Sequence, residues 1–166
     1  FTEDNAGLDM NGFAFYVAAN FYFREGCTFT HNGGKAYFDG NDIAQLIRNY
    51  DTNTIVFNDA EFSGTAVKRL YNNSFRFEGD VTINNSTLDG QSWPHYVEGN
   101  WVNTGIYRHS NTLHFDGAAQ SISQSSFYTV RFGGGGNTKT LTGDIILNGH
   151  LYIDDATLDV SGNNYN

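Results

Sequence analysis

The chain has 166 residues, of which 19 are glycine and only one is proline, and its formal net charge is -9 at pH 7. Nine Lys and Arg residues in total are too few for the clustered positive charge that a nucleic acid requires, so we exclude a nucleic-acid partner. No apolar run reaches the ~20 residues that cross a bilayer, and the composition therefore also argues against membrane insertion.

The first predicted elements recur further along the chain. The run that begins at Leu8, LDMNGFAFYVAANF, matches LDGQSWPHYVEGNW from Leu88, and LDVSGNNYN from Leu158 begins a third copy. Self-similarity of this kind is typical of repeat architectures. It predicts that residues recurring in both copies belong to a structural series.

The match continues in order between these motifs, while its displacement falls from 80 to 70 residues. The segment AYFDG ends at Gly40 and LHFDG ends at Gly117. The other matched pairs are Gln45/Gln120, Ile47/Ile122, Ile55/Val130, Phe57/Phe132, Lys68/Lys139, Leu70/Leu141, Val81/Leu151 and Ile83/Ile153. Surface turns accept small insertions and packed strands do not, so the matched segments are predicted to be strands.

Period-two alternation of apolar and polar residues, with Asn, Asp and Gly between the runs, supports strands throughout. The least strand-like stretch is NDIAQLIRNY, residues 41–50. It is compatible with one turn of helix that places Ile43, Leu46 and Ile47 on one face. Its counterpart from Ala118, AAQSISQSSF, is instead typical of an extended run.

We therefore predict an all-β protein, and two architectures compete: one β-sandwich per repeat, or a continuous β-solenoid in which each turn stacks on the last. No linker separates the copies, which favours the solenoid. At about 20 to 25 residues a turn it would have about seven turns. Residues 1–87 would be the first repeat with a preceding partial turn, residues 88–157 the second, and residues 158–166 the start of a third.

The segment from Val97 to the end of the chain resembles the tandem repeats of very large secreted surface proteins of Bacteroidota bacteria. The resemblance rests on the elements GNW, FDG, Q-x-I-x4-F-Y, K-T-L-x-G and TLDVSG, in that order. The first copy matches more loosely, with AANF for GNW and KRLYN for KTLTG. The resemblance implies a right-handed parallel β-helix that forms the stalk of an exported adhesin or gliding-associated protein on the cell surface.

Aromatic and polar residues gather in one part of the second copy: Trp93, His95, Tyr96, Trp101, Tyr107, Arg108 and His109. Exposed aromatic platforms bind sugar rings, so Trp93, Trp101 and Tyr107 are candidates for a glycan-binding face. However, Trp93, His95 and Trp101 stand where the first copy has Phe13, Phe15 and Phe21. Aromatic residues that match between copies favour core packing.

Paired carboxylates are the other candidates: Glu3/Asp4, Asp39/Asp42, Glu78/Asp80 and Asp154/Asp155. Of these, Asp39, Asp42, Asp154 and Asp155 could hold Ca²⁺ at an acidic corner. Polysaccharide-degrading enzymes on β-helix scaffolds also use carboxylates. Because Asp154 and Asp155 match Asn84 and Asn85, turn formation explains this pair better. The five His residues lack zinc-site spacing.

The remaining features have simple structural interpretations. The run Gly133 to Gly136 is predicted to be a turn, and the only cysteine, Cys27, a buried thiol. We expect no catalytic residue and no obligatory cofactor. The favoured hypothesis is a structural or adhesive stalk segment whose partners are neighbouring repeats of a longer polypeptide or copies placed end to end. The alternatives are a carbohydrate-binding module that contacts surface glycans and, third, a polysaccharide-degrading enzyme.

Overall fold

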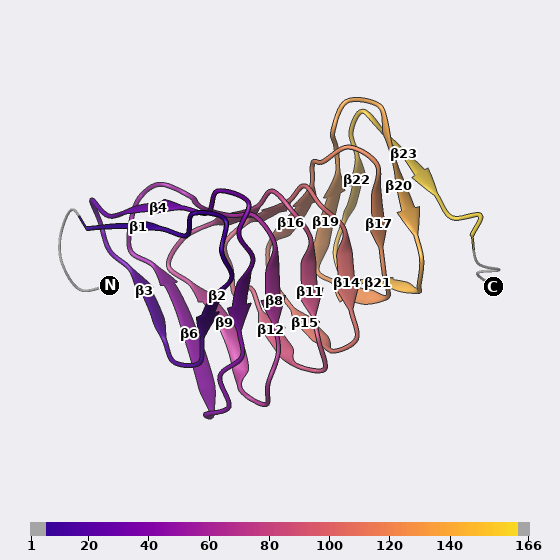
Figure 1. Cartoon of the computed structure of the whole chain (residues 1–166). Coiled ribbons are helices and arrows are strands. Elements are labelled where there is room, and N and C mark those ends of the chain that lie inside the picture. The colour runs from indigo at the N-terminus through magenta and orange to yellow at the C-terminus, as the bar shows by residue number, and fades with distance from the viewer. Residues whose placement is uncertain (1–5, 163–166) are drawn as a thin grey trace.

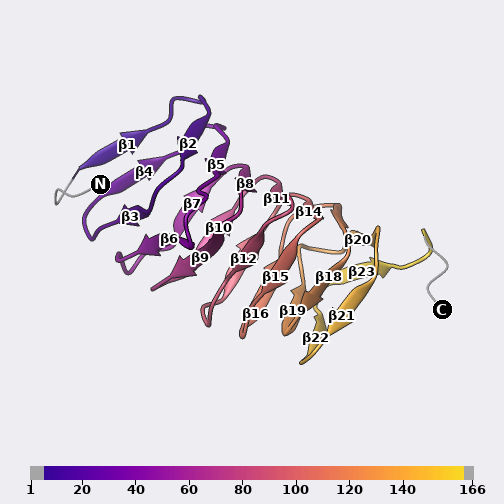
Figure 2. The ribbon, with the colours of Figure 1, turned by 90° about the horizontal axis from the view of Figure 1, so that it is seen from below.

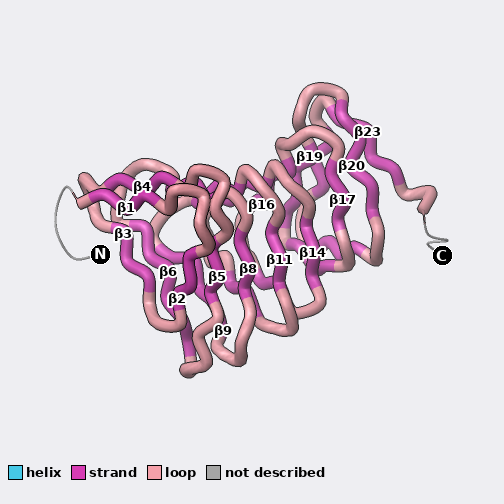
Figure 3. Tube along the Cα trace, viewed as in Figure 1, coloured by secondary structure: helices cyan, strands magenta, loops and turns pink. Residues whose placement is uncertain are grey.

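The computed structural model describes residues 6–162, and these residues form 23 short β-strands and no helix (Figure 1, Figure 3). Strands three apart in the chain pair side by side and in parallel, so that three strands complete one turn. The fold is a parallel β-solenoid of about eight turns. This confirms the predicted fold class, with one turn more than expected.

The strands form three faces along the solenoid. The eight-stranded sheet contains β2 (Phe15–Val17), β5 (Ala36–Phe38), β8 (Ala60–Phe62), β11 (Val81–Ile83), β14 (Trp101–Asn103), β17 (Gln120–Ile122), β20 (Asn137–Leu141) and β23 (Ala156–Asp159). The six-stranded sheet contains β7 (Ile55–Phe57), β10 (Phe75–Phe77), β13 (His95–Val97), β16 (Thr112–Phe115), β19 (Thr129–Phe132) and β22 (Leu151–Ile153). The five-stranded sheet contains β3 (Phe21–Phe23), β6 (Ala44–Asn49), β9 (Val67–Tyr71), β12 (Thr87–Asp89) and β15 (Ile106–Arg108).

Two strand pairs complete the faces. The pair β1 (Gly7–Asp9) and β4 (Thr28–Thr30) extends the six-stranded sheet, because β4 contacts β7. The pair β18 (Ser125–Phe127) and β21 (Ile145–Leu147) extends the five-stranded sheet, because β15 contacts β18. Figure 2 shows this last face from β3 to β21.

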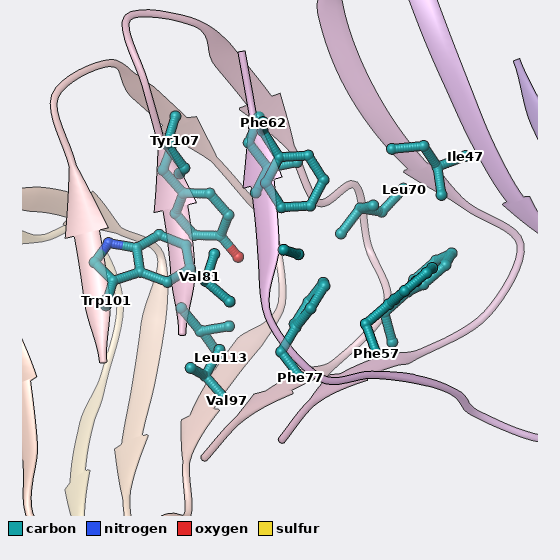
Figure 4. Packing of buried hydrophobic residues seen from close by; sticks show 14 of the residues in the cluster. Ile47, Phe57, Phe62, Leu70, Phe77, Val81, Val97, Trp101, Tyr107 and Leu113 are labelled. Atoms are coloured by element: carbon teal, nitrogen blue, oxygen red, sulfur yellow. The ribbon is translucent and has the colours of Figure 1, made fainter. Parts of the chain in front are cut away.

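A single core runs inside the three faces, and it is built from the inward-facing residue of each alternating pair (Figure 4). Aromatic rings stack on equivalent rings of the next turn. Phe38 and Phe62 stack with their centroids 5.4 Å apart, and Phe57 and Phe77 with theirs 5.9 Å apart. Burial of such side chains contributes about 1.5–3 kcal/mol each, so the stack stabilises every turn through its neighbours.

Sharp corners separate the strands, and the two copies use equivalent residues there. Asn85 and its counterpart Asp155 both have left-handed backbone, with φ of 48° and 51°. Asn and Asp tolerate this conformation better than most side chains do. The exchange of Asn for Asp between the copies therefore follows from turn formation, as we predicted.

The ambiguous stretch is extended rather than helical. Within residues 41–50, β6 pairs with β3 on one side and with β9 on the other. The sheet on both sides satisfies its backbone groups, which a single helical turn would leave partly unpaired. Cys27 is buried, and Gly133 to Gly136 form the turn between β19 and β20, as expected.

Each sequence copy spans eleven strands, one short of four complete turns. Leu8 lies on β1, Leu88 on β12 and Leu158 on β23, so the motif that opens each copy falls on a different face each time. The count also corrects one match. The counterpart of β7 is β18, so Phe57 corresponds to Phe127, whereas Val130 and Phe132 on β19 correspond to Ala60 and Phe62 on β8.

Residues 6–162 form one continuous solenoid. The ends of the first and last predicted ranges, residues 1–5 and 163–166, lie outside the described residues, as does the acid pair Glu3/Asp4.

Candidate functional site

The elements that recur in both copies meet at a polar corner inside the solenoid. In the first copy Gln45 is buried, and its Nε2 donates to Val17 O at 2.5 Å and to Ala19 O at 2.7 Å. Its Oε1 accepts the Gly40 N–H at 3.1 Å. One amide side chain therefore joins three backbone groups, of which Val17 O also accepts the Asp39 N–H at 3.2 Å.

The second copy builds the same corner from equivalent residues. Gln120 Nε2 donates to Val97 O at 3.1 Å and to Gly99 O at 2.5 Å, and its Oε1 accepts the Gly117 N–H at 3.1 Å. Glycine is required in this FDG element because a Cβ on Gly117 would lie 1.7 Å from Glu98 O. The FDG and Q-x-I elements are therefore parts of one scaffold device.

A buried lysine completes each corner. Lys68 Nζ donates to Gly40 O at 2.8 Å and to Ala66 O at 2.9 Å. Lys139 Nζ donates to Gly117 O at 2.5 Å, to Ala118 O at 3.0 Å and to Gln120 Oε1 at 2.7 Å. Both side chains have no exposed surface. Each ammonium group thus lies on the next turn of the solenoid and donates hydrogen bonds back to the corner.

Burial shifts the titration of both lysines. Desolvation lowers the pKa of Lys68 to about 8, against the opposing attraction of Asp39, and it lowers the pKa of Lys139, against that of Asp116. A lysine with a lowered pKa can act as a nucleophile at an accessible site. Here the side chains are enclosed, and the ammonium groups make two hydrogen bonds at Lys68 and three at Lys139, so the arrangement is a structural one.

Replacing Lys139 by methionine should destabilise the protein by about 2–4 kcal/mol, because the buried Gly117 O and the partly buried Ala118 O lose the ammonium donor and Gln120 Oε1 keeps only the Gly117 N–H. Chemical denaturation measures this change. Lys35, which forms a partly exposed ion pair with Glu61 at 2.9 Å, is the control, and Lys35→Met should cost at most about 1 kcal/mol. A Lys139→Met protein as stable as the wild type would show that desolvating the charge costs as much as its hydrogen bonds return.

The three aromatic candidates do not share one exposed surface. Trp101 is only 2% exposed and Tyr107 is also buried, whereas Trp93 is 42% exposed in a turn. The rings of Trp101 and Tyr107 pack edge to face in the core with centroids 4.8 Å apart (Figure 4). The part of the glycan hypothesis that relies on an exposed Trp101 and Tyr107 is therefore wrong, because the alternation of β14 and β15 turns both rings inward.

Two histidines lie beside these rings. His95 is buried, its Nε2 lies 2.8 Å from Gly90 O, and its Nδ1 accepts the Phe75 N–H at 3.1 Å. This pairing requires the neutral ring with its proton on Nε2. Desolvation, helped by repulsion from His109, lowers the pKa of His95 to about 3. The pKa of His109 is lowered as well, chiefly by desolvation.

The carboxylate candidates are dispersed. Asp154 forms an ion pair with Arg131 at 2.5 Å, Asp155 occupies the left-handed corner, and Asp42 lies beside a small hollow near Gln45. Asp39 Oδ1 is buried without a hydrogen-bond partner near Lys68. Within residues 6–162, no group of three or more His, Cys, Asp or Glu is arranged to hold a metal ion.

Sequence reasoning missed one outward-facing feature, a ladder on the six-stranded sheet. The Arg76 guanidinium lies 4.9 Å from the Tyr96 ring centroid, and the Tyr96 ring stacks on His114 at 4.6 Å. Arg76 also pairs with Glu98. Only the pairing of β10, β13 and β16 aligns these side chains, so spacing in the sequence could not reveal them.

The C-terminal turn exposes several apolar side chains. In β22, Leu151 is 42% exposed and Ile153 is 47% exposed, and Leu147 in β21 is also exposed. Their counterparts in the first copy, Val81, Ile83 and Phe77, are buried. The difference arises because β13 and β14 cover the first copy, whereas β21, β22 and β23 are each paired on one side only among the described residues.

Beside this turn, an open hollow of about 390 Å³ lies where the five-stranded sheet gives way to β18 and β21. Two of its polar side chains, Ser125 and Asn103, are already hydrogen-bonded, whereas the Tyr107 hydroxyl is buried without a partner. Ser125 Oγ accepts from Trp101 Nε1 and from Asn103 Nδ2, both at 2.8 Å. A ligand that needed Ser125 Oγ would have to compete with these two bonds.

The described residues include no helix long and apolar enough to span a membrane. No protein-family model, no curated protein and no solved structure matches the chain, so its fold and the geometry of its repeats carry the functional argument.

Proposed function

We propose that the chain is a structural segment of a repetitive stalk or fibre that is exported to the bacterial cell surface and there extends and presents adhesive parts. The observation that supports this proposal most is the role of the recurring residues. Gln45 and Gln120, Lys68 and Lys139, and Gly40 and Gly117 make equivalent contacts in both copies, and all of them hold turn to turn.

Two further observations agree with the proposal. The resemblance of the second copy to repeats of large Bacteroidota surface proteins, adhesins and gliding-associated proteins among them, concerns these same elements, FDG, Q-x-I and KTL. The formal charge of -9 gives the rod a well-hydrated surface suited to a position outside the cell. The proposal assigns no catalytic role and no cofactor to the chain.

The carbohydrate-binding alternative receives less support. Of its three aromatic candidates, only Trp93 lies at the surface, and a single ring does not form a platform for a chain of sugars. The enzyme alternative also receives less support: Asp154 is paired with Arg131, and within residues 6–162 no group of three or more His, Cys, Asp or Glu is arranged to hold a metal ion.

Genetic fusion of copies tests the proposal. Joining residue 157 of one copy to residue 8 of the next keeps the repeated motif in register. Fusions of two and four whole chains should scatter X-rays as rods of constant cross-section. The length of the rod should grow in proportion to the number of chains that are fused. A matched fusion with a ten-residue Gly-Ser linker should instead behave as flexibly joined units.

The location is tested separately, with antibodies against the chain on intact cells of the source organism. Labelling that disappears after protease treatment of intact cells is expected. Labelling only after lysis would contradict the proposed surface location, and in-register fusions that scatter like the linker control would contradict the stalk.

A further inference from the structure

The chain contains its own template for a contact between two copies. Inside the molecule, the turn β10–β11–β12 is covered by the turn β13–β14–β15. By the eleven-strand count, the counterpart of the covered turn is β21–β22–β23, which lies at the C-terminal end. Its inward side chains, which include Leu151 and Ile153, lack the cover that their counterparts have.

The counterpart of the covering turn lies at the opposite end of the molecule. It is the turn β2–β3–β4, as the match of Tyr16 with Tyr96 and of Phe21 with Trp101 indicates. In the described residues, β2 pairs only with β5 and β3 only with β6. Both strands therefore present a free edge, and such edges accept a further parallel strand.

We infer that the N-terminal turn of a second copy of the whole chain, that is, of a second molecule, stacks on the C-terminal turn of this chain. The solenoid then continues from one molecule to the next. The inference rests on the proposed structural role and names its partner. The internal registers fix the junction. Val81 lies opposite Trp101 and Ile83 opposite Asn103, so Leu151 lies opposite Phe21 of the next copy and Ile153 opposite Phe23.

The third strand of the junction involves an exchange. β1 and β23 carry the same motif, with Leu8 and Leu158 as equivalent residues, and both would occupy one position beside β4 of the second copy. β23 is already held by β20 on its other side, whereas β1 pairs with no strand except β4 in the described residues. β23 therefore displaces β1 of the second copy, and Leu158 lies opposite Phe29, as Leu8 does within one molecule.

The contact joins two different surfaces, so it does not close on itself. Each added copy exposes another C-terminal turn, and a head-to-tail contact of this kind builds open filaments. The product is a fibre in which the hydrogen bonding of all three faces continues across each junction.

Sedimentation velocity of the intact 166-residue chain over a range of concentrations tests the inference. We expect a concentration-dependent series of oligomers, and Leu151→Lys or Ile153→Lys should reduce association at least tenfold. Tyr152→Lys is the matched control: Tyr152 lies between them, is 48% exposed and faces outward, and its substitution should leave association unchanged. Because these side chains are exposed, the substitutions should leave the monomer folded. An unchanged thermal unfolding midpoint of each variant verifies this.

Disulfide formation tests the register. Thr82 lies opposite Val102 inside the molecule, so Tyr152→Cys in one copy should cross-link to Tyr22→Cys in another. Neighbouring strands are about 4.8 Å apart, which suits a disulfide. Tyr152→Cys mixed with Val102→Cys is the control. Val102 is equivalent to Tyr22 but lies on a middle turn of the solenoid rather than at its end.

A monomer at all concentrations, equal effects of Leu151→Lys and Tyr152→Lys, or equal cross-linking of the two cysteine mixtures would each overturn the inference. The in-register fusions distinguish such a failure from a failure of the proposed function. Rod-like fusions of a chain that stays monomeric would retain the stalk and reject the junction between separate copies.

Discussion

Trp101→Ala should lower the free energy of unfolding by about 3–5 kcal/mol, the usual cost of removing a large buried aromatic side chain. The ring packs against Tyr107, Phe115 and Phe127, and its Nε1 donates to Ser125 Oγ at 2.8 Å. The substitution leaves a cavity between successive turns and removes one hydrogen bond. Urea denaturation followed by circular dichroism measures the loss.

Two further variants show that position rather than residue type is responsible. Trp93→Ala, at an exposed site, should change stability by less than about 0.5 kcal/mol. Trp101→Phe installs the residue that the first copy has at Phe21 and should cost only about 1–2 kcal/mol, because Ser125 Oγ keeps the bond from Asn103. Equal effects of Trp93→Ala and Trp101→Ala would contradict the inward position of Trp101.

Acid should destabilise the protein through His95 well before the carboxylates titrate. The pKa of His95 is lowered to about 3 in the folded state, chiefly by desolvation, and lies near 6.5 in the unfolded chain. Below pH 6.5 the unfolded state takes up a proton that the folded state refuses. The stability contributed by this group is therefore complete above pH 6.5 and is lost as the pH falls toward 3. At pH 4.5 the loss should be about 2–3 kcal/mol.

His95→Phe, which installs the residue at the equivalent Phe15, tests the cause. The variant loses the bonds to Phe75 N–H and Gly90 O and should be less stable at pH 7.5, but its stability should change less between pH 6.5 and 4.5. His150→Gln, at an exposed site, should leave the wild-type slope unchanged. A His95→Phe protein with the full wild-type slope would assign the acid response to other groups.

The repeat was the part of the fold that the sequence predicted best. Alternation such as Phe75, Phe77 and then Val81, Ile83 identifies strands, and the shared motifs identify stacked turns, because neither signal depends on distant contacts. The turn count and the match of Ile55 with Val130 were less accurate, because insertions in the turns disguise which strands are equivalent. Only the pairing of β7 with β10 and of β16 with β19 resolves the register.

The polar corners could have been anticipated only in part. In the run VKRLY, Lys68 alternates with Leu70 and therefore shares its inward side, and Lys139 stands in the same relation to Leu141. Lysine is rarely buried, which favours the opposite assignment when a single copy is considered. Recurrence in the second copy was the available signal. The backbone acceptors that make the burial tolerable become visible only when three turns are stacked.

The eleven-strand copy has a consequence for any group displayed on a longer array. A side chain that occurs once per sequence copy would point in three directions in succession. Each direction is rotated by one third of a revolution about the solenoid axis from the one before. It would face the same way again only after three copies, or eleven turns, a rise of about 50 Å at ~4.8 Å per turn. A flat receptor surface would therefore meet every third copy, and the spacing of its own binding sites would decide whether it gains avidity.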